Sequence, residues 1–363
     1  MPSILDGLPA IYRGLLPAFF EREVPNESKA TCSNCAMCQG GSTLPVESVD
    51  GANHFFRPDT KCCTYHPRLP GYLVGALLSD ADPSLAEGRR RIEQKIQARV
   101  GITPLWVKPP GKYNFLYNHA RRAFGRAGSL LCPFYESQGG LCTIWKYREA
   151  VCSTFFCKYI AGEDGRKFWM TMKSYLSILE IQLSRYAAMK LIPDFILEGR
   201  DRKDGTEGVM SAEDLDDRPL PAKEYALLWR DWEGREAELY KRSYEIVRDF
   251  PASEVEKLLG LDATIELAIL DKLHRGITSP KLPNVLRFNP GATVKWLSDG
   301  SVALGSYSEN DAVALPGEAY QLLIQFNGRD PVSTVRQRLR DTMQADLDDS
   351  ILVELYRHRI LTE

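Results

Sequence analysis

The cysteines of this 363-residue chain are confined to its first half, and their grouping constrains the fold more than any other feature. There are nine of them, and none lies beyond residue 157. The first group comprises Cys32, Cys35, Cys38, Cys62 and Cys63. The second group comprises Cys132, Cys142, Cys152 and Cys157. Short Cys-x-x-Cys spacing is typical of thiolate metal sites, so we expect all nine residues to be metal ligands.

The overall composition is that of an ordinary globular protein and names no partner. Hydrophobic residues make up 44% of the chain, charged residues 26%, and the net charge is −2. No basic field is present that would attract nucleic acid or anionic lipid. The N-terminus lacks a basic region followed by an apolar core, and no stretch reaches the roughly 18 apolar residues of a membrane span. We therefore predict a cytoplasmic protein that binds neither nucleic acid nor membrane.

This compartment bears on the state of the thiols. In a reducing cytosol, an odd number of clustered cysteines fits metal ligation better than a disulfide framework. The alternative is a set of buried, inert thiols. Residues 31–70 are rich in Gly, Pro, Asn and Ser and show little periodicity. Because such a segment builds no core of its own, metal binding would supply the free energy that orders it.

Helical periodicity dominates the first three quarters of the chain. Apolar residues from Ile11 to Phe20 predict a short N-terminal helix. Further apolar stripes at three- and four-residue steps predict helices over 85–100, 167–190, 222–249 and 262–275. The first of these would be capped by Ser84.

Beyond residue 279 the pattern changes to alternation. The expected strands include Val285, Val294 and Val302, with a hairpin turn at Asp299-Gly300. Three short helices should follow, over 317–326, 331–343 and 347–360. We therefore predict a mainly α fold with three parts: an irregular cysteine-rich metal-binding region over 1–165, a helical region over 166–279, and a small α+β domain over 280–363.

The spacing of the first cysteines favours an iron–sulfur cluster. Thiolates at two-residue spacing, as in the run Cys32 to Cys38, can converge on one face of a cubane. The fourth ligand commonly comes from elsewhere and is often followed by proline, which makes Cys132 a candidate. Zinc is the alternative, since it prefers tetrahedral sites with two ligands from each of two Cys-x-x-Cys-like turns.

The number of sites and the complete ligand set stay open. Nine cysteines could supply two four-ligand sites, and the side chains of Cys62 and Cys63 point in different directions along an extended backbone. One of the pair could therefore serve a second centre. His54 and His66 flank this pair and could each add a nitrogen ligand, or each could be a hydrogen-bonded loop histidine.

The second cysteine group resembles the bacterial YkgJ-type cysteine-cluster family, described as a zinc- or iron-chelating domain. The matching residues are Cys132-Pro133-Phe134-Tyr135, Cys142, Ile144, Arg148, Cys152 and Phe155. Upstream the chain departs from the family run CxxCxxCC, because Gln39 follows Cys38 and a Cys-Cys pair arrives only at residues 62–63. The resemblance covers about 31–160 and implies a metal centre on the cysteines.

The C-terminal pattern resembles the PqqD-like winged-helix domain over about 283–363. The resemblance rests on the Arg287-Phe-Asn-Pro290 segment, the Asp299-Gly300 turn and the apolar pattern of the last three helices. It implies a winged-helix fold whose strand edge binds an extended peptide, in peptide modification. The alternative is a winged-helix module used for internal packing or dimerisation.

These observations lead to one expected function and one alternative. The first is a cytosolic protein with one or two iron–sulfur clusters of the 4Fe-4S type, whose C-terminal domain recruits a peptide or protein partner. The alternative is a structural zinc protein that acts as an adaptor. No glycine-rich nucleotide loop, radical-SAM Cys-x3-Cys-x2-Cys run or Ser/His/Asp arrangement stands out, so the sequence assigns no catalytic residue and leaves open whether the protein is an enzyme.

Overall fold

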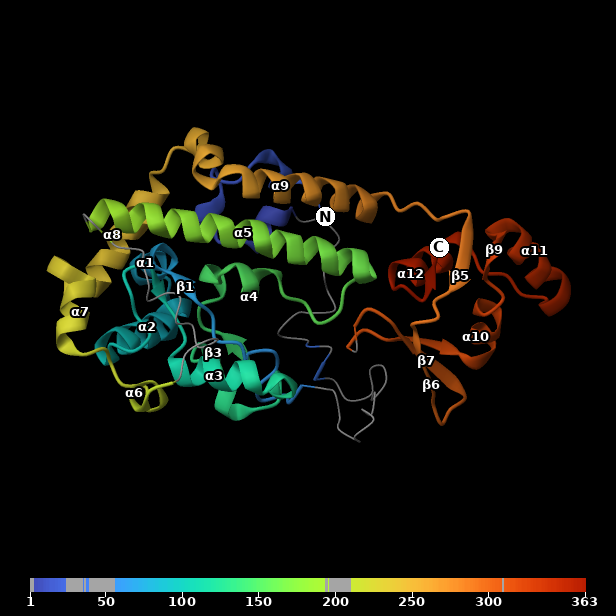
Figure 1. Cartoon of the computed structure of the whole chain (residues 1–363), viewed down its shortest axis with the longest axis horizontal. Helices are drawn as coiled ribbons and strands as arrows, with labels where there is room; N and C mark the ends of the chain where they lie inside the picture. The colour runs from blue at the N-terminus through green and yellow to red at the C-terminus, as the bar shows by residue number, and fades with distance from the viewer. Residues whose placement is uncertain are drawn as a thin grey trace.

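The computed structural model describes residues 3–23, 35, 37–38, 56–192, 195, 210–308 and 310–363. The fold is mainly helical with small antiparallel sheets, as predicted. Two long helices, α5 (Gly162–Leu191) and α9 (Ala252–Thr278), run side by side along the molecule, and the residues after 280 form a lobe at one end (Figure 1). None of the described helices has the length and apolarity needed to cross a membrane.

Helix α5 is the long helix predicted over 167–190, extended at its N-terminal end. Its buried face collects the apolar residues that recur at helical spacing, and that face packs on α9, α8 (Glu236–Arg248) and α4 (Ala150–Thr154). The fully buried members include Phe168, Met172, Leu176, Leu179 and Leu183. This face is the centre of the largest apolar core.

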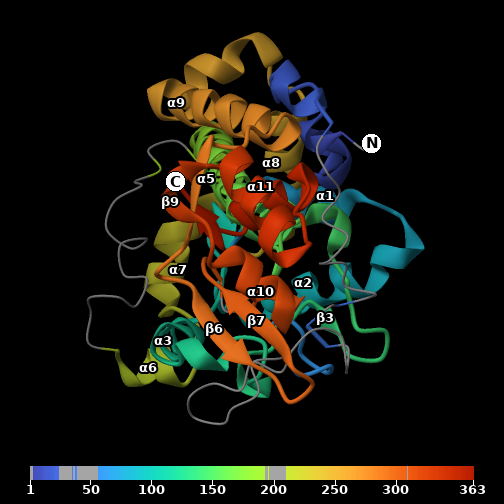
Figure 2. The same cartoon turned by 90° about the vertical axis from the view of Figure 1, so that its right-hand side faces the viewer.

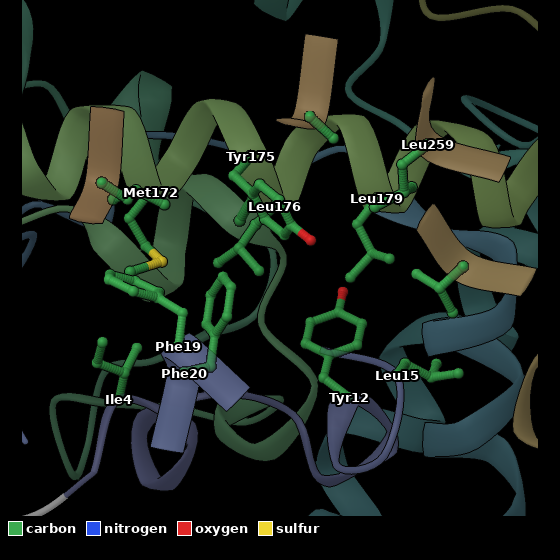
Figure 3. Close-up of a cluster of buried hydrophobic side chains, with 14 of the residues drawn as sticks. Ile4, Tyr12, Leu15, Phe19, Phe20, Met172, Tyr175, Leu176, Leu179 and Leu259 are labelled. Carbon is green, nitrogen blue, oxygen red and sulfur yellow. The ribbon is translucent and has the colours of Figure 1, made fainter. Parts of the chain in front are cut away.

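The N-terminal segment packs on α5 without forming the predicted helix. It consists of three short 3-10 turns, η1 (Ile4–Gly7), η2 (Ala10–Tyr12) and η3 (Ala18–Glu21). Its apolar side chains point toward α5 (Figure 3). Pro17 and the positive φ of Gly14 (+86°) interrupt the backbone between the turns, so apolar periodicity does not propagate into an α-helix.

A second core lies under the cysteine-bearing half. It packs α1 (Gly71–Ser79), α2 (Ala86–Ala98) and α8 around the two-stranded sheet β1–β2 (Leu69–Pro70 and Trp106–Val107). The helix predicted over 85–100 is α2, although the side chain that caps the preceding turn is Asp82 rather than Ser84. The other described elements that pack here are α3 (Gly111–His119), β3 (Tyr135–Glu136), β4 (Leu141–Cys142), α6 (Ala212–Leu215) and the 3-10 turns η6 (Arg121–Ala123), η7 (Gly128–Leu130) and η8 (Trp145–Tyr147).

The helix predicted over 222–249 is wrong as a single element. The chain forms α7 (Ala222–Trp229), a 3-10 turn over Arg230–Trp232, and then α8. Arg230 and Gly234 both have positive φ, which breaks the helical path between them. The helix predicted over 262–275 lies within α9, which begins ten residues earlier and is kinked at Gly260.

The C-terminal lobe has its own apolar core. One sheet has the order β10-β5-β9 and the other β6-β7-β8, all antiparallel. The strands are β5 (Val285–Phe288), β6 (Thr293–Trp296), β7 (Ser301–Gly305), β8 (Val313–Pro316), β9 (Asn327–Pro331) and β10 (Leu361–Thr362). The helices are α10 (Gly317–Leu323), α11 (Val332–Met343) and α12 (Asp349–Arg357). The three predicted helices and three predicted strands are confirmed, and β8, β9 and β10 are additional. Figure 2 views this lobe from its outer end, with β6, β7, α10 and α11 toward the viewer.

The lobe is fastened to the start of α5. Arg359 Nη2 lies 2.5 Å from Asp164 Oδ1, and Tyr159 N–H donates to Asp311 Oδ2 at 3.0 Å. Gly162 has a φ of +56°, and an added Cβ would lie 2.5 Å from the carbonyl oxygen of Arg357. The close approach of α12 to α5 therefore depends on a glycine at this position.

The packing of α1 on α8 generates a stability prediction. A Cβ on Gly75 would lie 1.9 Å from the backbone oxygen of Tyr240. This backbone atom, unlike the end of a flexible side chain, cannot rotate away from the added group. We expect Gly75→Ala to lower the free energy of unfolding by at least about 3 kcal/mol, because the two helices must separate. Urea denaturation followed by circular dichroism measures this.

The matched control is Gly276→Ala in α9, where an added Cβ meets nothing within 4 Å. It should raise the free energy of unfolding by up to about 1 kcal/mol, since alanine favours a helix over glycine. Equal effects of the two substitutions would contradict the packing described for α1 and α8.

Candidate metal centre

The second cysteine group is assembled from three separate elements. Cys132 precedes β3, Cys142 lies in β4 directly opposite Tyr135 of β3, and Cys152 lies in α4. The N–H of Phe134 points at Cys132 Sγ, at 3.5 Å. An N–H directed at a cysteine sulfur is a feature of ligating thiolates, because it stabilises their negative charge.

The three sulfurs lie within range of one another's charge. Burial raises the pKa of the Cys132 thiol to about 12, and a negative charge on Cys142 adds to the increase. Burial also raises the pKa of Cys152 well above its usual range. The negative charges of Glu149, Cys132 and Cys142 raise this pKa further, in that order of importance. In the absence of a cation the thiols of Cys132 and Cys152 are therefore protonated at neutral pH, and Cys142 lies near enough to both for its charge to affect them.

The first group is built on two turns. Cys38 N–H donates to the carbonyl oxygen of Cys35 at 3.0 Å, which closes the Cys-x-x-Cys turn. The Cys38 thiol lies 3.8 Å from the carbonyl oxygen of Arg57. Arg57 begins the turn that presents Cys62, and burial together with Cys35 and Cys62 raises the pKa of Cys38 to about 12.

The vicinal pair connects the two groups. The thiol of Cys62 is in range of Cys38, and its pKa is raised chiefly by a hydrogen bond with Cys63. The carbonyl oxygen of Cys63 accepts the N–H of Cys132 at 2.8 Å, and the side chains of Cys63 and Cys142 both pack on the core that contains Cys132. The segment with residues 56–63 therefore lies against the second group, and Cys62 and Cys63 stand between the two.

Eight of the nine cysteines are described, and none of these eight forms a disulfide. Cys157 is partly exposed and follows α4, while Cys32 and His54 lie outside the described residues. Across the described ranges, no three His, Cys, Asp or Glu side chains are close enough together to hold a metal ion as they stand.

His66 is the one described histidine that sequence analysis considered as a ligand. Its side chain is buried, and its Nε2 atom has no hydrogen-bond partner. Burial and the nearby charge of Lys95 lower its pKa well below the usual range, so the ring is neutral. The ring packs edge-on against Phe134, two residues beyond Cys132, with ring centroids 6.2 Å apart. A neutral imidazole with an unused nitrogen is a competent metal ligand.

Sequence reasoning missed two groups that support Cys152. Glu149 caps α4 and accepts the N–H groups of Val151 and Cys152, at 2.6 and 3.0 Å. Glu180, fully buried in α5, accepts the N–H of Ala150 at 2.7 Å and the hydroxyl of Tyr12 at 3.0 Å. The usable signal was a glutamate placed on the apolar stripe of a long helix, where a carboxyl group needs partners.

Lys95 is a further residue that the sequence did not single out. It lies in α2, and burial lowers the pKa of its ammonium group to about 8 while the charge of Cys132 opposes this. Gly88, in the same helix, allows close approach to the cysteine loop, because an added Cβ would lie 2.4 Å from the carbonyl oxygen of Thr143. Helix α2 thus brings a cation toward the thiols.

Comparison with protein-family models finds no match for this chain. Searches of the curated proteins and of the solved structures find none either.

The buried carboxyl of Glu180 predicts how stability depends on pH. Burial, and then the charge of Glu149, raises the pKa of Glu180 well above its usual range. The unfolded chain loses this proton at lower pH than the folded chain, so the contribution to stability is complete below the unfolded pKa and is lost as pH rises toward the folded pKa. We expect Glu180→Gln to reduce the fall in unfolding free energy between about pH 5 and pH 8.

Urea unfolding at a series of pH values measures this slope. The control is Glu254→Gln on the exposed surface of α9, which should leave the slope unchanged. Identical slopes for the wild type and Glu180→Gln would contradict the buried neutral carboxyl.

Proposed function

We propose that this protein holds a metal centre on its clustered cysteine thiolates and recruits a peptide or protein partner through its C-terminal lobe. The observation that carries the metal centre is that Cys132, Cys142 and Cys152, from three separate elements, lie near enough for their charges to act on one another. The backbone of Cys63 is hydrogen-bonded to that of Cys132. These residues are far apart in the sequence, and no disulfide uses their sulfurs.

The donor set fits a soft transition metal. Thiolate sulfur is the preferred ligand of iron–sulfur clusters and of structural zinc, and an unused imidazole nitrogen at His66 adds a further donor. The Cys132, Cys142 and Cys152 thiols would hold the centre together with one of the vicinal pair. Binding would draw the sulfurs inward and release their protons, so metal binding and local ordering would be coupled.

An iron–sulfur cluster is the proposed group. When bound, such a cluster supplies one-electron redox chemistry. The Cys-x-x-Cys-x-x-Cys run favours it, and the N–H directed at Cys132 Sγ fits a cluster ligand. Residues 31–160 would then form a domain of the YkgJ type, acting in the cytoplasm, where free thiols are maintained. A structural zinc site is the second candidate, favoured by the neutral imidazole of His66.

Metal analysis of anaerobically purified protein tests the proposal. We expect iron and acid-labile sulfide in equal amounts and absorbance in the visible, because thiolate-bound clusters are coloured. Cys142→Ser and Cys35→Ser should each lose metal. Complete loss in both variants would indicate one shared site, and loss of half in each would indicate two.

The control is Ser153→Ala, next to Cys152 in α4, which should retain the metal. A colourless protein with stoichiometric zinc would replace the iron–sulfur proposal with the zinc adaptor. Protein that contains no metal and takes up none on reconstitution would refute both.

Peptide recruitment is proposed at the outer edge of β6. Among the described strands, β6 pairs with β7 alone, so its other edge has open N–H and C=O groups. Val294 and Trp296 on this strand are 37% and 52% exposed. Trp296 also packs on Tyr320, with centroids 5.7 Å apart. An extended peptide could add a strand here and bury these side chains, as the PqqD-like resemblance implies.

A phage-displayed library of random peptides, panned on the full-length protein, tests this edge. We expect selected peptides to bind Val294→Lys at least about tenfold more weakly, since an edge lysine opposes strand addition. Met343→Lys, an exposed apolar position on α11, is the control and should bind normally. Unchanged binding to Val294→Lys would place the peptide site elsewhere.

A further inference from the structure

Helix α9 has an apolar stripe that faces away from the core. After the kink at Gly260, Leu261, Ile265 and Ile269 follow one another at four-residue steps and are 72%, 48% and 42% exposed. The opposite face of the same segment is buried against α5. In Figures 1 and 2, α9 lies along the upper margin of the molecule, above α5. The stripe is therefore open to a partner along its length.

The charges beside the stripe are divided by sign along the helix. Asp262 lies beside the first turn of the stripe and Lys272 beyond its last turn, and both are exposed. Neither forms an ion pair with another residue in the described ranges. Asp262 and Lys272 are each five positions from Leu267, while Ile265 and Ile269 are each two positions from it.

The stripe and its two flanking charges are complementary to the same surface on a second copy of the chain. When two copies of the helix pack antiparallel through their stripes, about a two-fold axis level with residue 267, Ile265 of one copy faces Ile269 of the other. Asp262 then faces Lys272 at both ends of the contact. A two-fold interface needs a patch that fits its own copy, with apolar residues at the centre and charges at the rim.

We infer that the chain forms a symmetric dimer through the outward face of α9, with a second copy of this chain as the partner. The inference is independent of the metal centre and of the peptide edge. The stripe is small for a stable interface, so we expect a dissociation constant in the micromolar range.

Sedimentation equilibrium of the full-length protein, with a reducing agent to prevent intermolecular disulfides, tests the inference. We expect a concentration-dependent monomer–dimer equilibrium. Ile265→Lys should remove dimerisation, because it buries an unpaired charge at the centre of the contact. Leu227→Lys, an exposed apolar position on α7, is the matched control and should leave the equilibrium unchanged.

A charge exchange tests the register. Asp262→Lys and Lys272→Asp should each weaken the dimer about tenfold or more, since each change puts like charges together at both ends. The double variant should restore most of the wild-type affinity. A monomer at all concentrations up to about 200 μM, well above the expected dissociation constant, would overturn the inference. So would a dimer that neither single charge variant weakens. Thermal unfolding of each variant verifies that the fold is retained.

Discussion

The burial of one face of α5 is the interaction on which the described structure depends. The N-terminal turns, α4, α8 and α9 all pack against this helix, and α12 contacts its start. Each fully buried leucine on this face contributes about 1.5–3 kcal/mol of hydrophobic free energy. The same face carries Glu180, whose carboxyl group binds the first N–H of α4. The helix therefore supports the core and also fixes the element that carries Cys152.

The fold was predictable from sequence where periodicity was long and uninterrupted. Helix α5 and the segment of α9 after its kink agree with their apolar stripes, because a consistent pattern over several helical turns outweighs local exceptions. Prediction was wrong where a short-range break decided the outcome. The N-terminal turns and the split between α7 and α8 both follow from backbone with positive φ at glycine or arginine, which an apolar pattern does not reveal. Strand β9, Asn327–Pro331, has a polar sequence without alternation and is held by its pairing with β5.

The residue types of the candidate site were predictable from sequence, but the hydrogen bonds and packing contacts that join its parts were not. Spacing alone grouped the cysteines, because ligands on tight turns must be close in sequence. The backbone hydrogen bond from Cys132 N–H to the carbonyl oxygen of Cys63 joins residues almost seventy positions apart in the sequence. It depends on how α2 and β3 pack in the second core. Lys95 and Glu149 have no spacing signature, since their relevance comes from burial near the thiols, and they are found only when the core is known. Glu180 has a weak signal, because a carboxyl group on the apolar stripe of a helix needs partners, but the sequence does not name those partners.

The fastening of the C-terminal lobe to α5 has a consequence for any chain that the lobe captures. The Arg359–Asp164 ion pair and the close contact at Gly162 hold the lobe directly, with few residues separating α5 from Cys157. A peptide bound at β6 would consequently lie at a fixed distance from the cysteines, because the lobe is held directly against α5. Its local concentration at the thiols would then depend on the number of residues beyond the docked strand. The lobe would therefore favour partners in which the segment between the docked strand and the reacting residue has a particular length.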